Sequence, residues 1–281
     1  MDELKNTDFK LQGYVDDIME IINRDTIEEL YDTAKITTDM INKWCNKNNF
    51  IISNDKTKYM IITNNNNPYI TQPIYIDNKE IEKVNEFKYL GIIIDTKLNW
   101  KSHINTLYKK LQKYIPIMYN LRNILCKNTL LTIYKTKILS SINYGLMIYY
   151  NIKSKENCQK IEKLQIKIIR IITRNIIQSK EQLSKNYNIL TLEQQYKLQW
   201  LQIIHTSIYN YKKLPAYFQK LYTIKQNRNG IKLITNYRNK QIGNRQSKNL
   251  ATELWNNLDI NLRNTQDIFH FKKELIKQYL K

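Results

Sequence analysis

Two adjacent carboxylates near the start of the 281-residue chain are the first side chains whose type and spacing suit chemistry. Asp16 and Asp17 lie between two short β-prone runs within Lys10 to Ile22, which predicts a β-hairpin with the acidic pair at its tip. Carboxylate oxygens are hard ligands of the kind that Mg²⁺ binds in proteins. Taken alone, the pair is equally typical of an acidic turn in solvent, so both interpretations stay open at this point.

A row of basic residues in the middle of the chain is the second such feature. Five of them recur at alternating three- and four-residue steps: Lys160, Lys163, Lys167, Arg170 and Arg174. On a helix this spacing places them on one face, beside an apolar face of isoleucine and leucine. We call these five residues the basic stripe. Such a stripe suits a helix that lies along a nucleic-acid backbone, and a merely solvated charged face is the alternative.

The net charge of the chain also points to a polyanionic partner. The 45 Lys and Arg against 25 Asp and Glu give a formal charge of +20, and such an excess attracts phosphate backbones and releases their counterions. An acidic membrane surface is a second partner for this charge. Lys, Asn, Ile and Tyr are over-used together, so drift of an A+T-rich coding sequence is a third explanation of the composition.

Cysteine spacing and hydropathy narrow the class of protein further. Cys45, Cys126 and Cys158 form no CxxC pair, which argues against a zinc knuckle and against a disulfide framework. The sequence has no run of about 20 apolar residues, so no membrane span is expected. We therefore expect an intracellular protein of the nucleus or cytoplasm with no membrane partner.

The elements that must position these residues indicate an α+β chain. A helix is predicted from Thr26 to Cys45, because Thr26 and Glu29 form a capping box. The strands within Leu11 to Ile22 and Phe87 to Asp95, the latter with Gly91 in its middle, are predicted to share one small antiparallel sheet backed by this helix. Further strands are expected at Phe50 to Ile52, at Tyr59 to Thr63 and around a hairpin turn at Asp77-Asn78, and 64–68 is predicted to be a polar loop.

From Ser102 onward the apolar spacing becomes helical and stays so. The first of these helices has Pro116 as a kink, and others are expected at about 128–143, 156–174, 191–211, 247–257 and 266–280. Capping boxes at Ser179/Gln182 and Thr191/Gln194 support the starts of two of the later helices. The segment 227–245 is predicted to be a long loop or an irregular β excursion. The isolated histidines are predicted to pack or cap: His103, His205 and His270.

The string Tyr14-Val15-Asp16-Asp17 resembles the YxDD signature of reverse transcriptases. In that family the aspartates sit on a hairpin turn and hold the divalent ions of nucleotidyl transfer. The resemblance therefore implies that Asp16 and Asp17 are catalytic ligands of Mg²⁺ or Mn²⁺. Val15 stands where the family usually has alanine, and we expect it to be tolerated because a β-branched residue suits a strand.

Two further segments follow in the family's order. Trp44-Cys45 to Ile62 resembles the helix–strand palm motif of non-LTR reverse transcriptases, in which Lys56 would protonate the pyrophosphate leaving group or neutralise phosphate charge. Phe87 to Gly91, Asp95 and Leu98 to Ile104 are similar to the family's primer-grip strand and thumb entry. The resemblance implies that three residues hold the primer end: Tyr89, Leu90 and Gly91. A solvated turn lysine and a core leucine are the alternatives for Lys56 and Leu90.

The C-terminal part is similar to the ending of the jockey-like branch of these elements. Trp255-Asn256, Leu262-Arg263 and Phe271-Lys272 match its successive motifs, with Asp259 in place of the usual proline. The resemblance thus covers nearly the whole chain. It implies an RNA template and a DNA primer as partners.

One part of the family's pattern is missing from these residues. In the family the fingers and the first palm motif, with its third metal-binding aspartate, precede YxDD, whereas thirteen residues precede Tyr14 here. Asp2 and Asp8 are the only upstream aspartates, and neither lies in a fitting strand. The chain is therefore interpreted as a fragment that binds metal weakly or not at all and does not polymerise alone. A further expected partner is then the missing half of the polymerase, which carries the fingers and the first palm motif.

The hypothesis from the sequence is a piece of an RNA-directed DNA polymerase of a non-LTR retrotransposon. The predicted fold is α+β, with a partial palm at 1–95, a helical thumb at 96–175 and a helical C-terminal region at 176–281. Two alternatives stay open. One is a non-catalytic nucleic-acid-binding module, and the other is a decayed remnant of an element.

Overall fold

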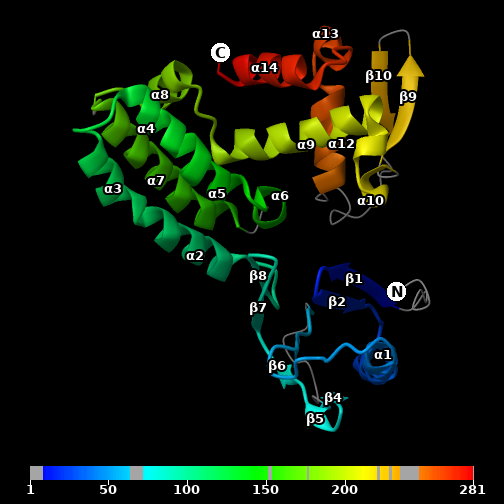
Figure 1. The fold of residues 1–281 in the computed structure, drawn as a ribbon. Helices are drawn as coiled ribbons and strands as arrows, with labels where there is room; N and C mark the ends of the chain where they lie inside the picture. The colour runs from blue at the N-terminus through cyan, green and yellow to red at the C-terminus, as the bar shows by residue number, and fades with distance from the viewer. Residues whose placement is uncertain are drawn as a thin grey trace. The chain divides into compact units, whose positions relative to one another are not determined.

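The computed structural model describes residues 9–63, 72–150, 154–175, 177–219, 222–227, 230–234 and 247–280. The chain divides into two compact units, Met1–Trp100 and Lys101–Lys281. The first unit runs from blue to cyan in Figure 1 and the second from green to red. The first has short strands around one long helix and the second is mostly helical, which confirms the predicted α+β class.

The first unit is organised around its long helix. Its elements are β1 (Phe9–Tyr14), β2 (Asp17–Ile22), α1 (Ile27–Lys47), β3 (Lys58–Tyr59), β4 (Tyr75–Ile76), β5 (Lys79–Glu80), β6 (Glu82–Lys83), β7 (Glu86–Tyr89) and β8 (Ile92–Asp95). The predicted start of α1 is confirmed, because the Thr26 side chain accepts a hydrogen bond from the Glu29 N–H at 3.2 Å. Tyr31 and Ala34 of α1 pack with four buried isoleucines: Ile61, Ile74, Ile76 and Ile81.

Both predicted hairpins of the first half are present. β1 and β2 pair antiparallel around Val15 and Asp16, and β4 and β5 pair around Asp77-Asn78. Asp77 and Asn78 have φ values of 48° and 61°, which aspartate and asparagine tolerate better than other non-glycine residues. The Asn42 side chain of α1 donates a hydrogen bond to the Asp77 carboxylate at 2.6 Å and ties this turn to the helix.

Four strand predictions are wrong or need revision. Phe87 to Asp95 is a hairpin of β7 and β8 instead of one strand, because Leu90 and Gly91, with φ values of 44° and 83°, reverse the chain. Among the described residues, β1–β2 and β7–β8 form separate two-stranded ladders instead of one sheet. Phe50 to Ile52 is not a strand, and the strand expected at 59–63 is reduced to β3, which pairs parallel with β6. The loop predicted at 64–68 lies outside the described residues.

The second unit contains the predicted helices, with some divided into shorter pieces. Its elements are α2 (Lys101–Gln112), α3 (Tyr114–Leu121), α4 (Lys127–Ile133), a π-helix η2 (Tyr134–Leu139), α5 (Ser140–Asn143), α6 (Leu146–Tyr149), α7 (Lys155–Thr173), α8 (Lys180–Tyr187), α9 (Leu192–Tyr209), a 3-10 turn η3 (Tyr211–Lys213), α10 (Ala216–Gln219), β9 (Thr223–Asn227), β10 (Gly230–Ile234), α12 (Ser247–Asn256), α13 (Ile260–Arg263) and α14 (Ile268–Tyr279). α2 ends at Gln112, because Pro116 lacks the N–H that would bond the Gln112 carbonyl. Both predicted capping boxes are present at the starts of α8 and α9.

Two helices hold the second unit together. α7 buries Ile161, Leu164 and Ile168 and contacts α2, α3, α4 and α8, which lie around it in Figure 1. α9 contacts α12 and α14, and α12 also contacts β10. Within the segment 227–245, predicted as a loop or irregular β excursion, residues 230–234 form strand β10, paired antiparallel with β9. Residues 228–229 and 235–245 lie outside the described residues. In the part of the chain that the structure describes, no helix is long and apolar enough to cross a membrane.

Candidate catalytic turn and nucleic-acid interface

The acidic pair lies at the tip of the β1–β2 hairpin. Tyr14 and Asp17 are the last cross-strand pair, so Val15 and Asp16 form a two-residue turn. Val15 is 92% exposed and has a φ of 58°, so it occupies the turn and not a strand as we expected. A left-handed conformation is unfavourable for a β-branched residue and costs on the order of 1–3 kcal/mol. This strain at the tip supports a functional role for the turn.

The two carboxylates of this turn are exposed and available to a ligand. Within the described ranges, neither Asp16 nor Asp17 takes part in an ion pair. Their oxygens are the hard donors that Mg²⁺ or Mn²⁺ prefers. No group of three or more His, Cys, Asp or Glu side chains suited to a metal ion occurs in the described part of the chain. The turn therefore presents two exposed carboxylates, and their role as metal ligands stays a prediction.

Lys56 projects from a second tight turn of the first unit. The Lys56 and Thr57 N–H groups both donate to the Ser53 carbonyl, at 3.2 and 2.9 Å, and close this turn. The Lys56 side chain is exposed, and no ion pair joins it to Asp16 or Asp17 among the described residues. The preceding motif residues are structural. Trp44 stacks on Phe50 with ring centroids 5.8 Å apart and closes the end of α1.

The three residues predicted to hold a primer lie at one hairpin turn. Tyr89 ends β7, and Leu90 and Gly91 form the turn to β8. Leu90 is 37% exposed, so the alternative that it is a core residue is wrong. A turn with a glycine at its tip permits close approach of another molecule to the backbone. The binding role of the three residues stays a prediction.

Four of the five residues of the basic stripe line one groove of the second unit. Lys163, Lys167, Arg170 and Arg174 project from α7 and its C-terminal end into a groove with a volume of about 540 Å³. Lys160 does not line it. Its ammonium group hydrogen bonds the Asn105 side chain and lies 5.8 Å from the centre of the Tyr108 ring, both on α2.

The other wall of the groove comes from α3 and the residue pair that follows it. Tyr119, Arg122 and Asn123 line this side, and Ile171 of α7 completes the lining. The Arg122 guanidinium lies 3.8 Å from the centre of the Tyr119 ring. Arg174 donates hydrogen bonds to the Arg122 carbonyl at 2.6 Å and to the Asn123 side chain at 3.4 Å. We call this feature the α3–α7 groove. Its α3 residues could not be found from the sequence, because only the packing of α3 on α7 brings them to the stripe.

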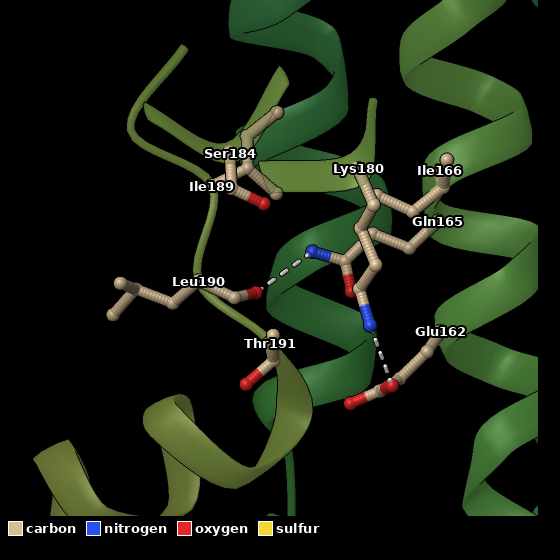
Figure 2. Close-up of a pocket in the computed structure, with 8 residues that line it drawn as sticks. All are labelled: Glu162, Gln165, Ile166, Lys180, Ser184, Ile189, Leu190 and Thr191. Carbon is tan, nitrogen blue, oxygen red and sulfur yellow. Dashed lines mark hydrogen bonds and ion pairs between the residues drawn. The ribbon is translucent and has the colours of Figure 1, made fainter. Parts of the chain in front are cut away.

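A much smaller cavity of about 10 Å³ lies where α7 meets the segment between α8 and α9. Figure 2 shows Glu162 and Gln165 pointing toward Lys180 and Leu190. Glu162 accepts from the Lys180 ammonium group at 3.2 Å, and Gln165 donates to the Leu190 carbonyl at 3.1 Å. Since this volume is at most that of one water molecule, the cluster is a structural joint and not a ligand site.

The C-terminal motif residues form an internal clasp. Trp255 and Arg263 both donate hydrogen bonds to the Ile231 carbonyl at 3.2 Å. Asn256 donates to the Leu233 carbonyl and accepts from the Leu233 N–H, both at 2.9 Å. Trp255 and Phe271 are fully buried, and their ring centroids are 5.8 Å apart. These residues fasten β10 to α12 and α13, so they support the fold instead of binding a substrate.

His103 and His205 pack as predicted, whereas the His270 side chain is exposed. His103 packs on Tyr149 with centroids 5.0 Å apart, and burial lowers its pKa. His205 stacks on Phe271 with centroids 4.6 Å apart. Burial lowers the pKa of His205, while its hydrogen bond to the Thr265 carbonyl and the charge of Asp267 oppose that shift. His270 contributes its backbone N–H to the Asp267 cap of α14 at 2.6 Å.

Comparison with known proteins identifies relatives of this chain. It is 29% identical over 165 residues to the RNA-directed DNA polymerase from mobile element jockey of Drosophila funebris. The matched region makes up 57% of this chain and 18% of that protein. It is 29% identical over 104 residues to the probable RNA-directed DNA polymerase from transposon X-element of Drosophila melanogaster, covering 36% and 11% of the two chains. The jockey polymerase of Drosophila melanogaster is 25% identical over 174 residues, covering 61% and 19%.

These similarities confirm the resemblance to jockey-like elements over 36–61% of the chain, whereas the motifs indicated a resemblance over nearly all of it. The chain spans less than a fifth of the length of each of these relatives, at 18%, 11% and 19%. No family model matches the chain. No solved structure matches it either.

Proposed function

Because the chain is a relative of jockey-like non-LTR reverse transcriptases, we propose that it supplies part of the palm and thumb of an RNA-directed DNA polymerase. The observation that carries this proposal is the hairpin turn at Tyr14-Val15-Asp16-Asp17. It presents two exposed carboxylates at the tip of two paired strands, as the YxDD signature requires. An RNA template and a DNA primer are the substrates that the proposal implies.

The proposed chemistry divides between the two turns of the first unit. Asp16 and Asp17 would hold Mg²⁺ or Mn²⁺, and the bound ions would activate the primer 3′-hydroxyl and stabilise charge on the leaving pyrophosphate. Lys56 provides an exposed ammonium group on a turn fixed by two backbone hydrogen bonds to Ser53. An ammonium group in that position neutralises charge on a phosphate or donates its proton to the leaving group. The Leu90-Gly91 turn would position the primer end, since its backbone can be approached closely.

The proposed domains are a partial palm at 1–95, a thumb at 96–175 and a C-terminal region at 176–281. The end of the first compact unit at Trp100 supports the palm–thumb boundary. The α3–α7 groove supports the thumb, because a thumb must hold nucleic acid without reading its sequence. Phosphate contacts from Lys and Arg bind in this way.

A hairpin graft tests the catalytic part of the proposal. Phe9–Ile22 would replace the YxDD hairpin of the jockey polymerase, and primer extension on an RNA template would be measured. We expect the graft to extend primers, and we expect Asp16→Asn or Asp17→Asn within it to abolish extension. Gln12→Ala, at an exposed position of the grafted β1 away from the turn, is the matched control and should leave extension intact. An inactive graft, or extension that survives Asp16→Asn, would contradict the assignment.

A non-catalytic nucleic-acid-binding module is the second candidate function. The specific observation in its favour is the α3–α7 groove, which lies in the second unit and uses none of the proposed catalytic residues. Binding that is unaffected by Asp16→Asn, together with an inactive graft, would favour this alternative.

A further inference from the structure

The α3–α7 groove concentrates positive charge without compensation from the protein. Five of its lining side chains are cationic and none is acidic: Arg122, Lys163, Lys167, Arg170 and Arg174. None of the five belongs to an ion pair within the described residues, although lysines elsewhere in this unit pair with Glu162, Glu193 and Glu274. Like charges in one groove repel one another, so the arrangement is favourable only when an anion enters.

Unused hydrogen-bond donors point the same way. The Nε–H groups of Arg122 and Arg170 are buried from solvent and have no acceptor in the part of the chain that the structure describes. A buried donor without an acceptor costs about 1–3 kcal/mol, more when it is charged. Phosphate oxygens are suitable acceptors for guanidinium groups, which bind them with two parallel hydrogen bonds. Two arginines of the groove therefore have hydrogen-bonding capacity that the described residues do not use, which favours an anionic ligand with acceptor oxygens.

An aromatic surface distinguishes this groove from a simple phosphate site. Tyr119 is 52% exposed although it lines the groove, and the Arg122 guanidinium covers part of its ring at 3.8 Å. The hydrogen bond from Arg174 to the Arg122 carbonyl fixes the backbone at this point. Aromatic rings and guanidinium planes are the surfaces on which unpaired nucleobases stack.

We infer that the α3–α7 groove binds single-stranded nucleic acid, with phosphodiesters on its cations and one base on the Tyr119–Arg122 pair. This inference rests on the proposed nucleic-acid role of the basic stripe and specifies its ligand. The bases of a duplex are paired and stacked on one another, so one reaches Tyr119 only after unpairing and unstacking, at a cost of a few kcal/mol. The groove volume of about 540 Å³ lies in the range of pockets that hold a ligand the size of a nucleotide.

The test is fluorescence anisotropy with the full chain and four labelled probes. These are a uridine RNA dodecamer, a thymidine DNA dodecamer, a DNA dodecamer with abasic sugars, and a blunt duplex of the same length. We expect both base-containing single strands to bind more tightly than the duplex. The abasic strand keeps the phosphates and loses stacking, so it should bind on the order of tenfold more weakly than the thymidine strand. Different affinities for RNA and DNA would show which sugar the groove prefers.

Two sets of variants separate base stacking from charge. Tyr119→Ala should weaken binding of the thymidine strand on the order of tenfold and leave the abasic strand unchanged, whereas Tyr119→Phe should retain stacking. Lys163→Gln, Lys167→Gln and Arg170→Gln together should weaken all four probes. The matched control removes the same charge from exposed lysines outside the groove: Lys185→Gln, Lys212→Gln and Lys213→Gln.

The outcomes distinguish the inference from the function on which it rests. An unchanged affinity of Tyr119→Ala for the thymidine strand, or tighter binding of the duplex, would overturn the single-strand inference. The basic stripe would remain a nucleic-acid surface if the charge variant still weakened binding. If the charge variant bound all probes like its control, the proposed interface itself would be wrong.

Discussion

The Asp95 carboxylate accepts a hydrogen bond from the backbone N–H of Trp100 at 2.7 Å. Its other oxygen accepts from the N–H groups of Lys97 and Asn99, both at 3.1 Å. This loop holds Leu98 and Trp100 at φ values of 50° and 62°, which are unfavourable for residues with a Cβ atom. Asp95 therefore stabilises a strained loop at the end of the first unit. The Asp95 side chain of this motif thus has a structural role, to which Trp100 contributes its backbone N–H.

Removal of the Asp95 carboxylate should open this loop. In Asp95→Ala three backbone donors lose their acceptor, and we expect the amides of Lys97, Asn99 and Trp100 to exchange with deuterium faster by roughly 5–30-fold. Asp95→Asn keeps one acceptor oxygen and should show a smaller increase. Hydrogen exchange with mass spectrometry on the full chain measures both. Asp39→Ala, an exposed aspartate of α1, is the control, and equal exchange in all variants would contradict this role.

Acidification should destabilise the second unit through its buried histidines. Burial lowers the pKa of His205 and of His103 below the usual value of about 6.5 that the unfolded chain has. The unfolded state therefore takes up protons first, so stability is complete above about pH 6.5 and falls as the pH drops toward the folded pKa values. Protonation would also give His205 Nδ1 a buried N–H, and that atom has no partner among the described residues.

Thermal melts at pH 7.5 and pH 5.5 measure this effect. We expect His205→Gln and His103→Gln each to reduce the difference in Tm between the two pH values, even where they lower stability overall. His270→Gln removes an exposed histidine and should keep the wild-type difference. A difference that is the same in all three variants would show that the two buried histidines do not cause it.

The C-terminal clasp predicts a contrast between two neighbouring asparagines. Asn256→Ala removes both hydrogen bonds to Leu233 and should cost about 1–3 kcal/mol, which lowers Tm by about 2–4 °C per kcal/mol for a unit of this size. Asn257 is exposed, so Asn257→Ala should stay close to wild type. Circular dichroism melts of both variants make the comparison. Equal midpoints would mean that the clasp does not stabilise β10.

Nucleic-acid binding should depend on salt through the groove cations. A plot of the logarithm of affinity against the logarithm of salt concentration should become shallower by about two to three units when Lys163, Lys167 and Arg170 are changed to Gln, because fewer counterions are released. An RNA–DNA duplex is a suitable probe, since phosphate contacts are independent of sequence. The control with Lys185, Lys212 and Lys213 changed to Gln should keep most of the slope. Identical slopes would remove the stripe from the binding surface.

Local signals explain which features could be predicted from the sequence. The Thr26 cap, the two capping boxes and the hairpins at Asp16 and Asp77 depend on residues within a few positions of one another, and all are present. The Leu90-Gly91 turn was missed because leucine seldom adopts positive φ, so the apolar run around it resembled one strand.

Features that depend on tertiary packing could not be predicted from the sequence. The separation of the strand ladders depends on pairing between distant segments, which hydropathy does not encode. The spacing of the basic stripe predicted its face correctly, but Lys160 contacts α2 and the groove takes Tyr119 and Arg122 from α3. The spacing of residues along α7 predicts neither the contact of Lys160 with α2 nor the contribution of α3 to the groove.

Primer extension tests the central claim that Asp16 and Asp17 are the metal-binding turn of a polymerase. The purified chain, with Mg²⁺ or Mn²⁺, a primed RNA template and nucleotides, should not extend the primer. Two carboxylates alone hold the ions weakly, and positioned ions provide most of the catalysis. Addition of a separate polypeptide that carries the fingers and first palm motif of a jockey polymerase should restore extension, and Asp16→Ala should abolish it again. Extension by the chain alone, or restored extension that persists in Asp16→Ala, would contradict the account.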